Sequence, residues 1–441
     1  MILLVLTFIL IFSIHILRKS GFRFLGKNAH PMALTIFLQI FISTLIGTTA
    51  VAAYDFPMGY GVESEISEAT KNFTLITTYI SVAILFLGLA LLYNTKILTP
   101  LSYKPDNQST SQLKWLTFVS FVILVIKLFT VSEIPMLLAL NGDVNAAGAA
   151  KARILTNKEG VTLFGLNYVF RSFTSYIYLA SVMLLSHDSK NSSKRFIFLI
   201  NLFLAVVNSL YDIQKYTVVL LCISTFWLFY IRDGRTIYLV RGGIVALTLC
   251  ILMFVITLGY GVDSELLVNT LRRIFVVQNE GMFYIYEFLK PDSKYIGLGF
   301  PLGNLLQLDQ IDPAVEVVQI LFPSESETWI NANTYYVAHA WTIFGNLAVF
   351  IGPLFVLLNL VLILRISNSF IKKSSAIYYP IIFWMIIRFP LINIFTDFMW
   401  LKVLLDTVIN LAFVMFFIYF FEKINLRKLI HSLTPSRVPN D

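Results

Sequence analysis

The chain contains little charge and almost no cysteine. Of its 441 residues, 13% are charged and 57% are hydrophobic, and the mean hydropathy is +0.78. This composition is too apolar for a protein that folds in water, so the lipid bilayer is the expected solvent. The two cysteines, Cys222 and Cys250, both lie in apolar runs. A disulfide framework is therefore not expected, and neither is redox chemistry.

The sequence also lacks the motifs of several functional classes. No Gly-rich sequence precedes Lys-Ser or Lys-Thr, so ATP-driven pumping is not expected. No HExxH motif, Cys/His cluster or DxD pair occurs in the segments assigned below to the outer side, so we expect neither a catalytic metal nor another cofactor. The net charge of +8 matches a multi-pass membrane protein with positively charged inner loops, and nucleic acid is not an expected partner.

Long apolar runs recur along the whole chain, without the alternating pattern of a β-barrel. A helix needs about 20 apolar residues to cross roughly 30 Å of hydrocarbon, and its backbone polar groups must be paired within the segment. We therefore expect an all-α polytopic membrane protein in which residues 1–441 form a single transmembrane domain. About eleven transmembrane helices are predicted, near residues 1–17, 33–53, 73–93, 115–132, 161–185, 196–211, 216–231, 242–260, 336–364, 377–394 and 398–420.

The distribution of Lys and Arg predicts the orientation of these helices. The first span has no basic residues before it and four after it, which is typical of an anchor and opposite in polarity to a cleaved signal peptide. The connections on the side where the first span ends contain 20 Lys and Arg residues, whereas the connections on the other side contain 9 and are longer. Because cytoplasmic loops carry the excess of positive charge, we expect the N-terminus outside and the C-terminus in the cytoplasm, in a bacterial inner membrane.

Four cations lie inside the apolar runs, namely Lys127, Arg171, Arg388 and Lys402. An unpaired charge there costs from about 3 to more than 10 kcal/mol, so such residues are functional candidates. The predicted orientation places all four toward the outer side. Lys127 and Lys402 can equally well extend to the outer interface, and Asp406, one turn after Lys402, can pair with it. Arg171 and Arg388 lie deeper and have no acid within one helical turn, which favours a functional role.

Pro390 follows Arg388 by two residues. A proline inside a helix leaves a carbonyl without its N–H partner and kinks the helix, so we expect a bend beside this arginine. A bent helix can open a cavity toward the outer leaflet. Several fixed cations would line it, and the guanidinium group suits phosphate in particular. The sequence therefore predicts an anion-binding cavity.

The largest outer segment, residues 261–335, is too long for a passive connection, and we expect a partly helical periplasmic loop. Within it, residues 265–289 place apolar side chains at helical spacing, which predicts a helix lying in the membrane interface. Its two adjacent arginines, Arg272 and Arg273, can bind either anionic lipid headgroups or a substrate phosphate. In another outer segment, residues 133–160, an Ala-rich stretch carries Arg153 and is either a short interfacial helix or a solvated connection.

Further along the large loop, residues 297–303 form a turn-rich, Gly-rich strip. Asp312 and Pro313 then predict the N-cap and first residue of a short helix. Tyr335, Tyr336 and Trp341 follow, with His339 between them. The simplest interpretation is an aromatic belt at the membrane surface that includes an incidental histidine. The alternative is a catalytic or ligand-binding role for His339.

Three strings in this region resemble the Wzy-type O-antigen polymerases: Leu271-Arg-Arg-Ile-Phe275, the strip 297–303, and residues 333–345, which read Asn-Thr-Tyr-Tyr-Val-Ala-His-Ala-Trp-Thr-Ile-Phe-Gly. The layout of many spans with one long outer loop in the C-terminal half is also similar. The resemblance implies a membrane-embedded glycosyltransferase that joins oligosaccharide repeat units linked to undecaprenyl diphosphate. Its expected partners are these lipid-linked oligosaccharides, membrane lipids and, as a further candidate, a chain-length regulator protein.

The resemblance also implies roles for single residues. The leaving diphosphate would be held by the cations identified above, and His339 or an unidentified acid would deprotonate the acceptor hydroxyl. The related O-antigen ligases place an asparagine after a histidine in a late outer loop, whereas Ala340 follows His339 here, which argues against a ligase. A flippase of lipid-linked oligosaccharides is the other alternative. The proposed diphosphate-binding residues are Arg171, Arg388, Arg272, Arg273, Arg153, Lys127 and Lys402.

Overall fold

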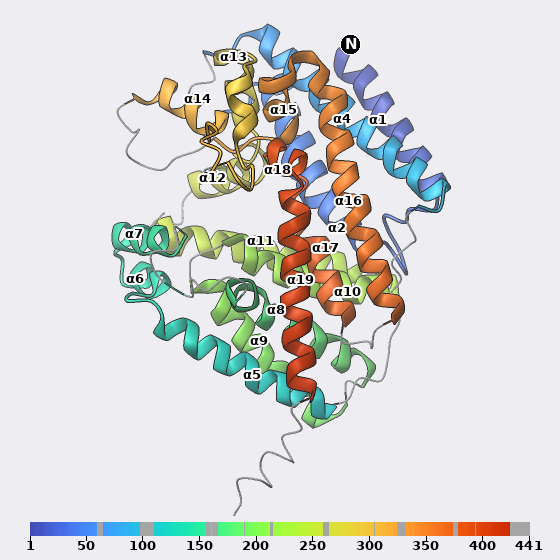
Figure 1. Ribbon diagram of the computed structural model, residues 1–441, viewed down its shortest axis with the longest axis vertical. Helices are drawn as coiled ribbons and strands as arrows, with labels where there is room; N and C mark the ends of the chain where they lie inside the picture. The colour runs from blue at the N-terminus through green and yellow to red at the C-terminus, as the bar shows by residue number, and fades with distance from the viewer. Residues whose placement is uncertain are drawn as a thin grey trace, which may run out of the picture. The chain divides into compact units, whose positions relative to one another are not determined.

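The computed structural model is helical throughout the part of the chain that it describes (Figure 1). The described residues are 1–59, 65–97, 110–155, 160, 166–188, 190–211, 215–258, 264–303, 305–323, 332–373, 378–392 and 394–423. The chain divides into two compact units. Unit 1 contains residues 1–103, 222–373 and 382–407, and unit 2 contains residues 104–221, 374–381 and 408–441.

Within the described residues, eight helices are long and apolar enough to cross a membrane, which supports a multi-pass membrane protein. The expected count of eleven spans and the expected orientation remain predictions. The eight helical stretches are Ile2–Lys19, Met32–Tyr54, Glu68–Asn94, Gln112–Phe129, Ser192–Leu210, Tyr216–Asp233, Tyr336–Ser369 and Lys402–Phe420, and two shorter apolar stretches are Ser172–Ser186 and Ile237–Leu252.

Unit 1 is built around α4 (Glu68–Asn94), which packs against α1 (Ile2–Lys19), α3 (Gly47–Tyr54) and α16 (Ala348–Lys373). The buried face of α4 carries Leu85, Phe86 and Leu89, each at most 1% exposed. At Gly88 a side chain would collide with Leu357 of α16, so the small residue lets these helices approach closely. The remaining helices wholly inside this unit are α2 (Met32–Thr35), α11 (Ile237–Leu258), α12 (Ser264–Phe275), α13 (Gly281–Phe288), η3 (Ser293–Gly297), α14 (Pro313–Leu321), α15 (Tyr336–Phe344), η5 (Gly345–Leu347) and α18 (Phe395–Met399).

Between α2 and α3 runs a π-helix, η1 (Ile36–Ile46). Two hydroxyls follow its wider hydrogen-bond register, because Ser43 Oγ donates to the carbonyl of Leu38 and Thr44 Oγ1 donates to that of Gln39, each five residues earlier. Most π-helical segments are single-turn bulges, often at functional sites, so an eleven-residue π-helix is unusual. The side chains of α2 and η1 become important at the candidate site below.

Unit 2 has a core of three helices, α5 (Thr110–Phe129), α8 (Leu166–His187) and α9 (Ser192–Leu210), which pack pairwise against one another. An interhelical hydrogen bond holds two of them, since Asn201 Nδ2 of α9 donates to Thr117 Oγ1 of α5 at 2.8 Å. Beside this core, α6 (Pro135–Leu140) packs against α7 (Val144–Leu155). The Ala-rich stretch that carries Arg153 is thus a helix. The helices α10 (Lys215–Asp233), α17 (Tyr378–Ile387) and α19 (Lys402–Lys423) contribute residues to both units.

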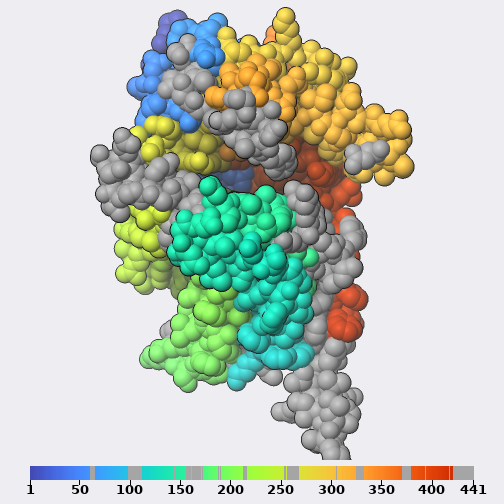
Figure 2. All heavy atoms as spheres, turned by 90° about the vertical axis from the view of Figure 1, so that its left-hand side faces the viewer, coloured from blue at the N-terminus to red at the C-terminus, as the bar shows by residue number. Residues whose placement is uncertain are grey.

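The long loop of unit 1 differs from the expected interfacial helix over residues 265–289, and that prediction is wrong. The structure ends α12 at Phe275 and starts α13 only at Gly281. The aromatic side chains of α13 do not lie on a membrane surface, because Phe283 and Tyr284 are at most 1% exposed. They pack inside a group formed by α13, α14, α15 and η3 at the start of α4 (Figure 1). In Figure 2 the gold atoms of α13, η3 and α14 form one continuous surface region.

Candidate functional site

The expected bend at Pro390 is a complete break in the helix. α17 ends at Ile387, and regular structure resumes with α18 at Phe395. Pro390 has no N–H to bond to the carbonyl of Ile386, four residues earlier. The Ile386 carbonyl instead accepts two other donors, the N–H of Phe389 at 3.2 Å and Thr35 Oγ1 of α2 at 3.1 Å. The carbonyl that the proline frees is therefore satisfied by its own chain and by a neighbouring helix.

One turn after Thr35, Gln39 of η1 satisfies the irregular backbone that follows. Its Nε2 donates to the carbonyl of Phe389 at 3.0 Å, and its Oε1 accepts the N–H groups of Leu391 at 2.6 Å and Ile392 at 3.2 Å. Gln39 is 6% exposed. We call residues 388–392 together with Thr35 and Gln39 the break site. Its backbone is held in one conformation at a depth where unpaired groups would be costly.

Arg388 begins the break site and is half-buried. Its guanidinium carbon lies 5.7 Å from the centre of the Trp384 ring, within reach of a cation–π contact. Among the described residues, no carboxylate lies within ion-pair distance of Arg388, and the buried Trp384 Nε1 has no acceptor. The expectation of an uncompensated cation beside a distorted helix thus agrees with the structure.

The junction between α12 and α13 rests on the same π-helix. Asn279 Nδ2 donates to the carbonyl of Ser43 at 2.6 Å, and the carboxylate of Glu280 accepts the N–H of Gly59 at 2.6 Å. Arg272 is half-buried and Arg273 is exposed, both in the last turn of α12 just before this junction. The structure therefore brings the segment of Arg272 and Arg273 and the segment of Arg388 to one helix, η1.

Lys402 has a different partner from the one expected. Its Nζ lies 3.2 Å from Asp397 Oδ1 of α18, so its counter-ion precedes it in the chain, and the predicted pairing with Asp406 is wrong. Leu401, between the two helices, has a φ of 54° and turns the chain back. Gly299 of the Gly-rich strip also packs here, because a Cβ on it would lie 2.7 Å from Asp397 Oδ1. Lys402 is thus part of a structural contact.

Two cations of unit 2 are also engaged. Lys127 is 7% exposed, and its Nζ donates to Asn208 Oδ1 at 2.8 Å and lies 3.8 Å from the centre of the Tyr211 ring. It therefore binds inside the protein and does not extend to the interface. Arg153 pairs with Glu133 at 2.7 Å. Arg171 lies in α8, but its side chain is outside the described residues. Lys127 and Arg153 have structural partners, which weakens their assignment to a diphosphate.

His339 of α15 is buried inside unit 1. It is 1% exposed, and its Nε2 is 3.4 Å from Asp312 Oδ1. Asp312 caps α14 as the sequence predicts, since Oδ1 accepts the N–H of Ala314 at 2.8 Å. Tyr335 and Tyr336 are fully buried and do not form the expected aromatic belt. The histidine is therefore part of a packed Asp–His pair.

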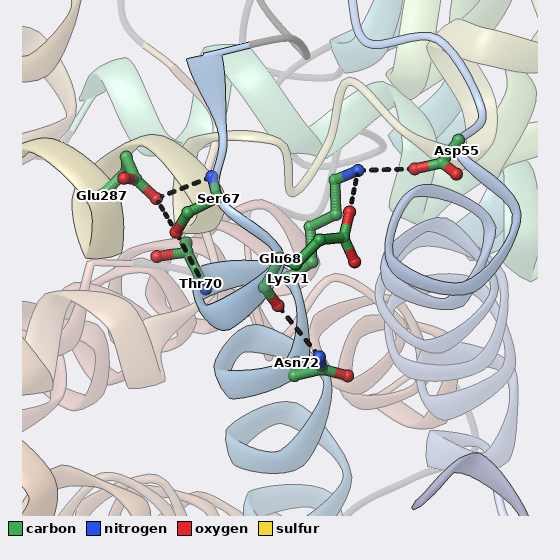
Figure 3. A network of polar contacts seen from close by, with 7 residues as sticks. All are labelled: Asp55, Ser67, Glu68, Thr70, Lys71, Asn72 and Glu287. Carbon is green, nitrogen blue, oxygen red and sulfur yellow. Dashed lines mark hydrogen bonds and ion pairs between the residues drawn. The ribbon is translucent and has the colours of Figure 1, made fainter. Parts of the chain in front are cut away.

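A network of polar side chains, with Lys71 buried and Asp55 and Glu68 exposed, fixes the beginning of α4 (Figure 3). Lys71 Nζ pairs with Asp55 at 2.5 Å and with Glu68 at 2.8 Å, which ties α4 to the end of α3. Ser67, the N-cap of α4, binds Glu287 of α13 through both its N–H and its hydroxyl. Burial acts to raise the pKa of the Glu287 carboxyl, but the hydrogen bonds from Thr70 and Ser67 outweigh it and lower the pKa.

The break site and the Asp312–His339 pair are connected through aromatic packing. The ring centre of Phe398 in α18 lies 6.2 Å from that of Tyr336 in α15 and 6.2 Å from that of Phe389 in the break site. Phe398 of α18 thus packs against aromatic residues of both α15 and the break site. Across the described residues, no group of three His, Cys, Asp or Glu side chains could hold a metal ion.

Comparisons of the chain with known protein families, with curated proteins and with solved structures find no match. Sequence reasoning missed Thr35, Gln39 and the partner of His339. Thr35 and Gln39 could have been found as polar residues four apart in an otherwise apolar run, since such pairs share one helix face. Their partners, about 350 residues later in the chain, carry no local signal.

Proposed function

We propose that this protein is a polymerase of oligosaccharide repeat units linked to undecaprenyl diphosphate, acting at the periplasmic face of a bacterial inner membrane. The observation that carries the proposal is Arg388, a half-buried arginine without a carboxylate partner among the described residues, at the start of a fixed break in a helix. The proposed topology has eleven spans, with the N-terminus outside and the long loop in the periplasm.

The chemistry needs a stabilised leaving group. When the glycosidic bond to undecaprenyl diphosphate breaks, negative charge develops on the diphosphate, and fixed guanidinium groups in a site of low dielectric stabilise it. Arg388 and Arg171 would serve this purpose within the membrane, and Arg272 and Arg273 near its surface. Arg153, Lys127 and Lys402 hold internal partners and play a smaller part in this proposal.

A flippase for lipid-linked oligosaccharides is the second candidate. One observation favours it: transporters often place their substrate sites at discontinuous helices, and the α17–α18 segment is discontinuous. The sequence shows no convincing internal repeat of the kind common in transporters, and the predicted orientation places the cations toward one face. These features place the polymerase first. The ligase is the third candidate, because Ala340 follows His339 where the O-antigen ligases place an asparagine.

Deletion of the gene tests the proposal directly. A strain without the polymerase should attach single repeat units to its surface lipid, visible as loss of the long-chain ladder on a gel of extracted polysaccharide. Arg388→Ala and Arg171→Ala should reproduce this phenotype at unchanged protein level. Arg388→Lys should support only part of the normal long-chain synthesis, because an ammonium group cannot form the bidentate contact with the diphosphate.

A matched control is Arg365→Ala, which removes an arginine of α16 whose contact is with the carbonyl of Ile97. This variant should keep the long chains. Loss of every exported unit in the deletion strain would contradict the polymerase function and support the flippase function. Normal ladders in both the Arg171 and Arg388 variants would remove these residues from the site.

A further inference from the structure

We propose that Asp312 is the general base that deprotonates the acceptor hydroxyl, and that His339 is the positioning residue behind it. This inference rests on the proposed polymerase function and names the acid that the sequence left unidentified. The sequence left the base open between His339 and an unidentified acid. The exposure of the two side chains decides between them in favour of the acid.

The two carboxylate oxygens of Asp312 have different surroundings. Oδ1 accepts the N–H of Ala314 at 2.8 Å and lies 3.4 Å from His339 Nε2, which is within ion-pair distance but makes no hydrogen bond. No donor among the described residues contacts Oδ2, and the side chain is 19% exposed, whereas that of His339 is 1% exposed. An incoming hydroxyl can therefore reach the aspartate but not the histidine. The fixed oxygen orients the carboxylate, and the other oxygen is the one left to react.

Other charged groups near this pair are already engaged. Within the elements packed against α14 and α15, Lys294 of η3 pairs with Glu316 of α14 at 2.6 Å, Glu287 of α13 binds Ser67, and Asp397 of α18 pairs with Lys402. Lys71 at the start of α4 pairs with Asp55 and Glu68. Of the described residues, His339 alone has a titratable side chain within ion-pair distance of Asp312. His339 is therefore the ionisable neighbour that acts on the proposed base among the described residues.

The surroundings keep the carboxylate ionised. Burial acts to raise the pKa of Asp312, but the contact with His339 and the N–H of Ala314 outweigh it and hold the pKa below its ordinary value. The charged form is therefore populated at every pH above the ordinary range of an aspartate, including neutral pH. A general base must be unprotonated before the reaction, and this condition is met.

The proposed step balances as follows. The acceptor hydroxyl oxygen forms a bond to the anomeric carbon of the donor sugar while its proton passes to Asp312 Oδ2. The bond between that carbon and the diphosphate oxygen breaks, and its electron pair leaves with undecaprenyl diphosphate. Asp312 then returns the proton to water. The phenyl rings of Phe398 and Phe389 connect this region to Arg388, which faces the departing charge in the proposed function.

Asp312→Asn separates catalysis from helix capping. Asparagine caps a helix as well as aspartate does, so α14 should keep its N-cap while the base is lost. Chain elongation by the full-length protein in its native membrane should fall about 100-fold or more, the usual contribution of a general base. The matched control is Asp292→Asn, because Asp292 caps η3 through the N–H of Lys294 and makes the same chemical change nearby. It should leave elongation unchanged, and both variants should unfold at the wild-type temperature.

His339→Gln tests the positioning role through the pH profile of elongation. The amide carries no charge, so the pKa of Asp312 should rise, because burial is then opposed by the Ala314 N–H without the coulombic effect of the histidine. Elongation should then be lost at a higher pH than in the wild type as the solution is acidified. A histidine that serves packing alone would lower the rate at every pH without moving this limb.

A measurement independent of polymerisation checks the pair itself. In protein labelled with [13Cε1]histidine, the signal of His339 is identified as the one missing from His339→Gln. Asp312→Asn should change the chemical shift of this signal, because the substitution removes the carboxylate beside the ring. An unchanged signal would overturn the pairing. A changed signal with undiminished elongation would overturn the role of Asp312 as base, whereas the polymerase function itself is tested by the ladder of the deletion strain.

Discussion

At the scale of single residues, Gln39 makes the hydrogen bonds that join η1 to the irregular backbone of the break site. Its amide binds three backbone groups that Pro390 and the end of α17 leave without helical partners. The residue lies 6% exposed in an apolar run, where an unpaired amide would itself be costly. Gln39 and the break therefore depend on each other, and neither is stable alone.

Changing Gln39→Leu should destabilise the protein by about 2–4 kcal/mol, because three backbone groups each lose a hydrogen bond to the amide, although Leu391 N–H keeps its bond to the Phe389 carbonyl. Thr35→Val, which removes one hydrogen bond to Ile386, should cost about 1 kcal/mol. Chemical denaturation of the protein in detergent measures both values. Hydrogen exchange should also accelerate at Leu391 and Ile392 in the Gln39 variant. An equal or smaller effect of Gln39→Leu than of Thr35→Val would contradict the proposed clamp.

At the scale of elements, local sequence rules were sufficient where the cause was local. Pro390 indicated a distortion in a helix, and α17 ends just before it. Asp312 and Pro313 predicted the start of α14, and the Gly-rich strip contains turns, as expected. The structure departs from the prediction where the cause is distant. The helical spacing over residues 265–289 gave no sign of a break, which is set by Asn279 and Glu280 binding Ser43 and Gly59, more than 200 residues away.

The same distinction explains the cations. The sequence identified Arg388 as unpaired because no acid lay within one turn, and the described structure agrees. It offered Asp406 as one possible partner of Lys402 by the same rule, whereas the structure pairs Lys402 with Asp397, which precedes it beyond Leu401 with its positive φ. The sequence could not predict Asn208 as the partner of Lys127, because Asn208 lies on another helix. Pairing across elements requires the fold.

Two glycine substitutions compare a strained position in the Gly-rich strip with an open position in helix α7. Gly299 has a φ of +73°, and a Cβ would lie 2.7 Å from the Asp397 carboxylate. Gly299→Ala should therefore destabilise the protein by about 1–2 kcal/mol from backbone strain alone. Gly148→Ala should stabilise it by about 0.5–1 kcal/mol, because Gly148 lies in helix α7 with open space around it. Thermal unfolding in detergent measures both shifts, and shifts of the same sign would contradict this account.

At the scale of the whole molecule, the function depends on which face of the membrane the long loop occupies. The charge distribution predicts the periplasmic side, with 20 Lys and Arg residues in the proposed inner connections and 9 in the outer ones. α4 offers a clean test because it runs from Glu68 to Asn94, about 40 Å at 1.5 Å per residue, and is therefore long enough to span the bilayer. Its first turn binds α13 of the long loop through Ser67 and Glu287, so the side of this turn is the side of the loop.

The variants Asn72→Cys and Thr95→Cys place a thiol at either end of α4, at positions that are both exposed. With Cys222 and Cys250 replaced by alanine, a membrane-impermeant maleimide should label Asn72→Cys in intact spheroplasts. It should label Thr95→Cys only after lysis. The reverse pattern would place Asp312, His339 and the long loop in the cytoplasm. A periplasmic polymerase could not then use them, because its lipid-linked substrates would be on the other side of the membrane, and the proposed function would fail together with the proposed base.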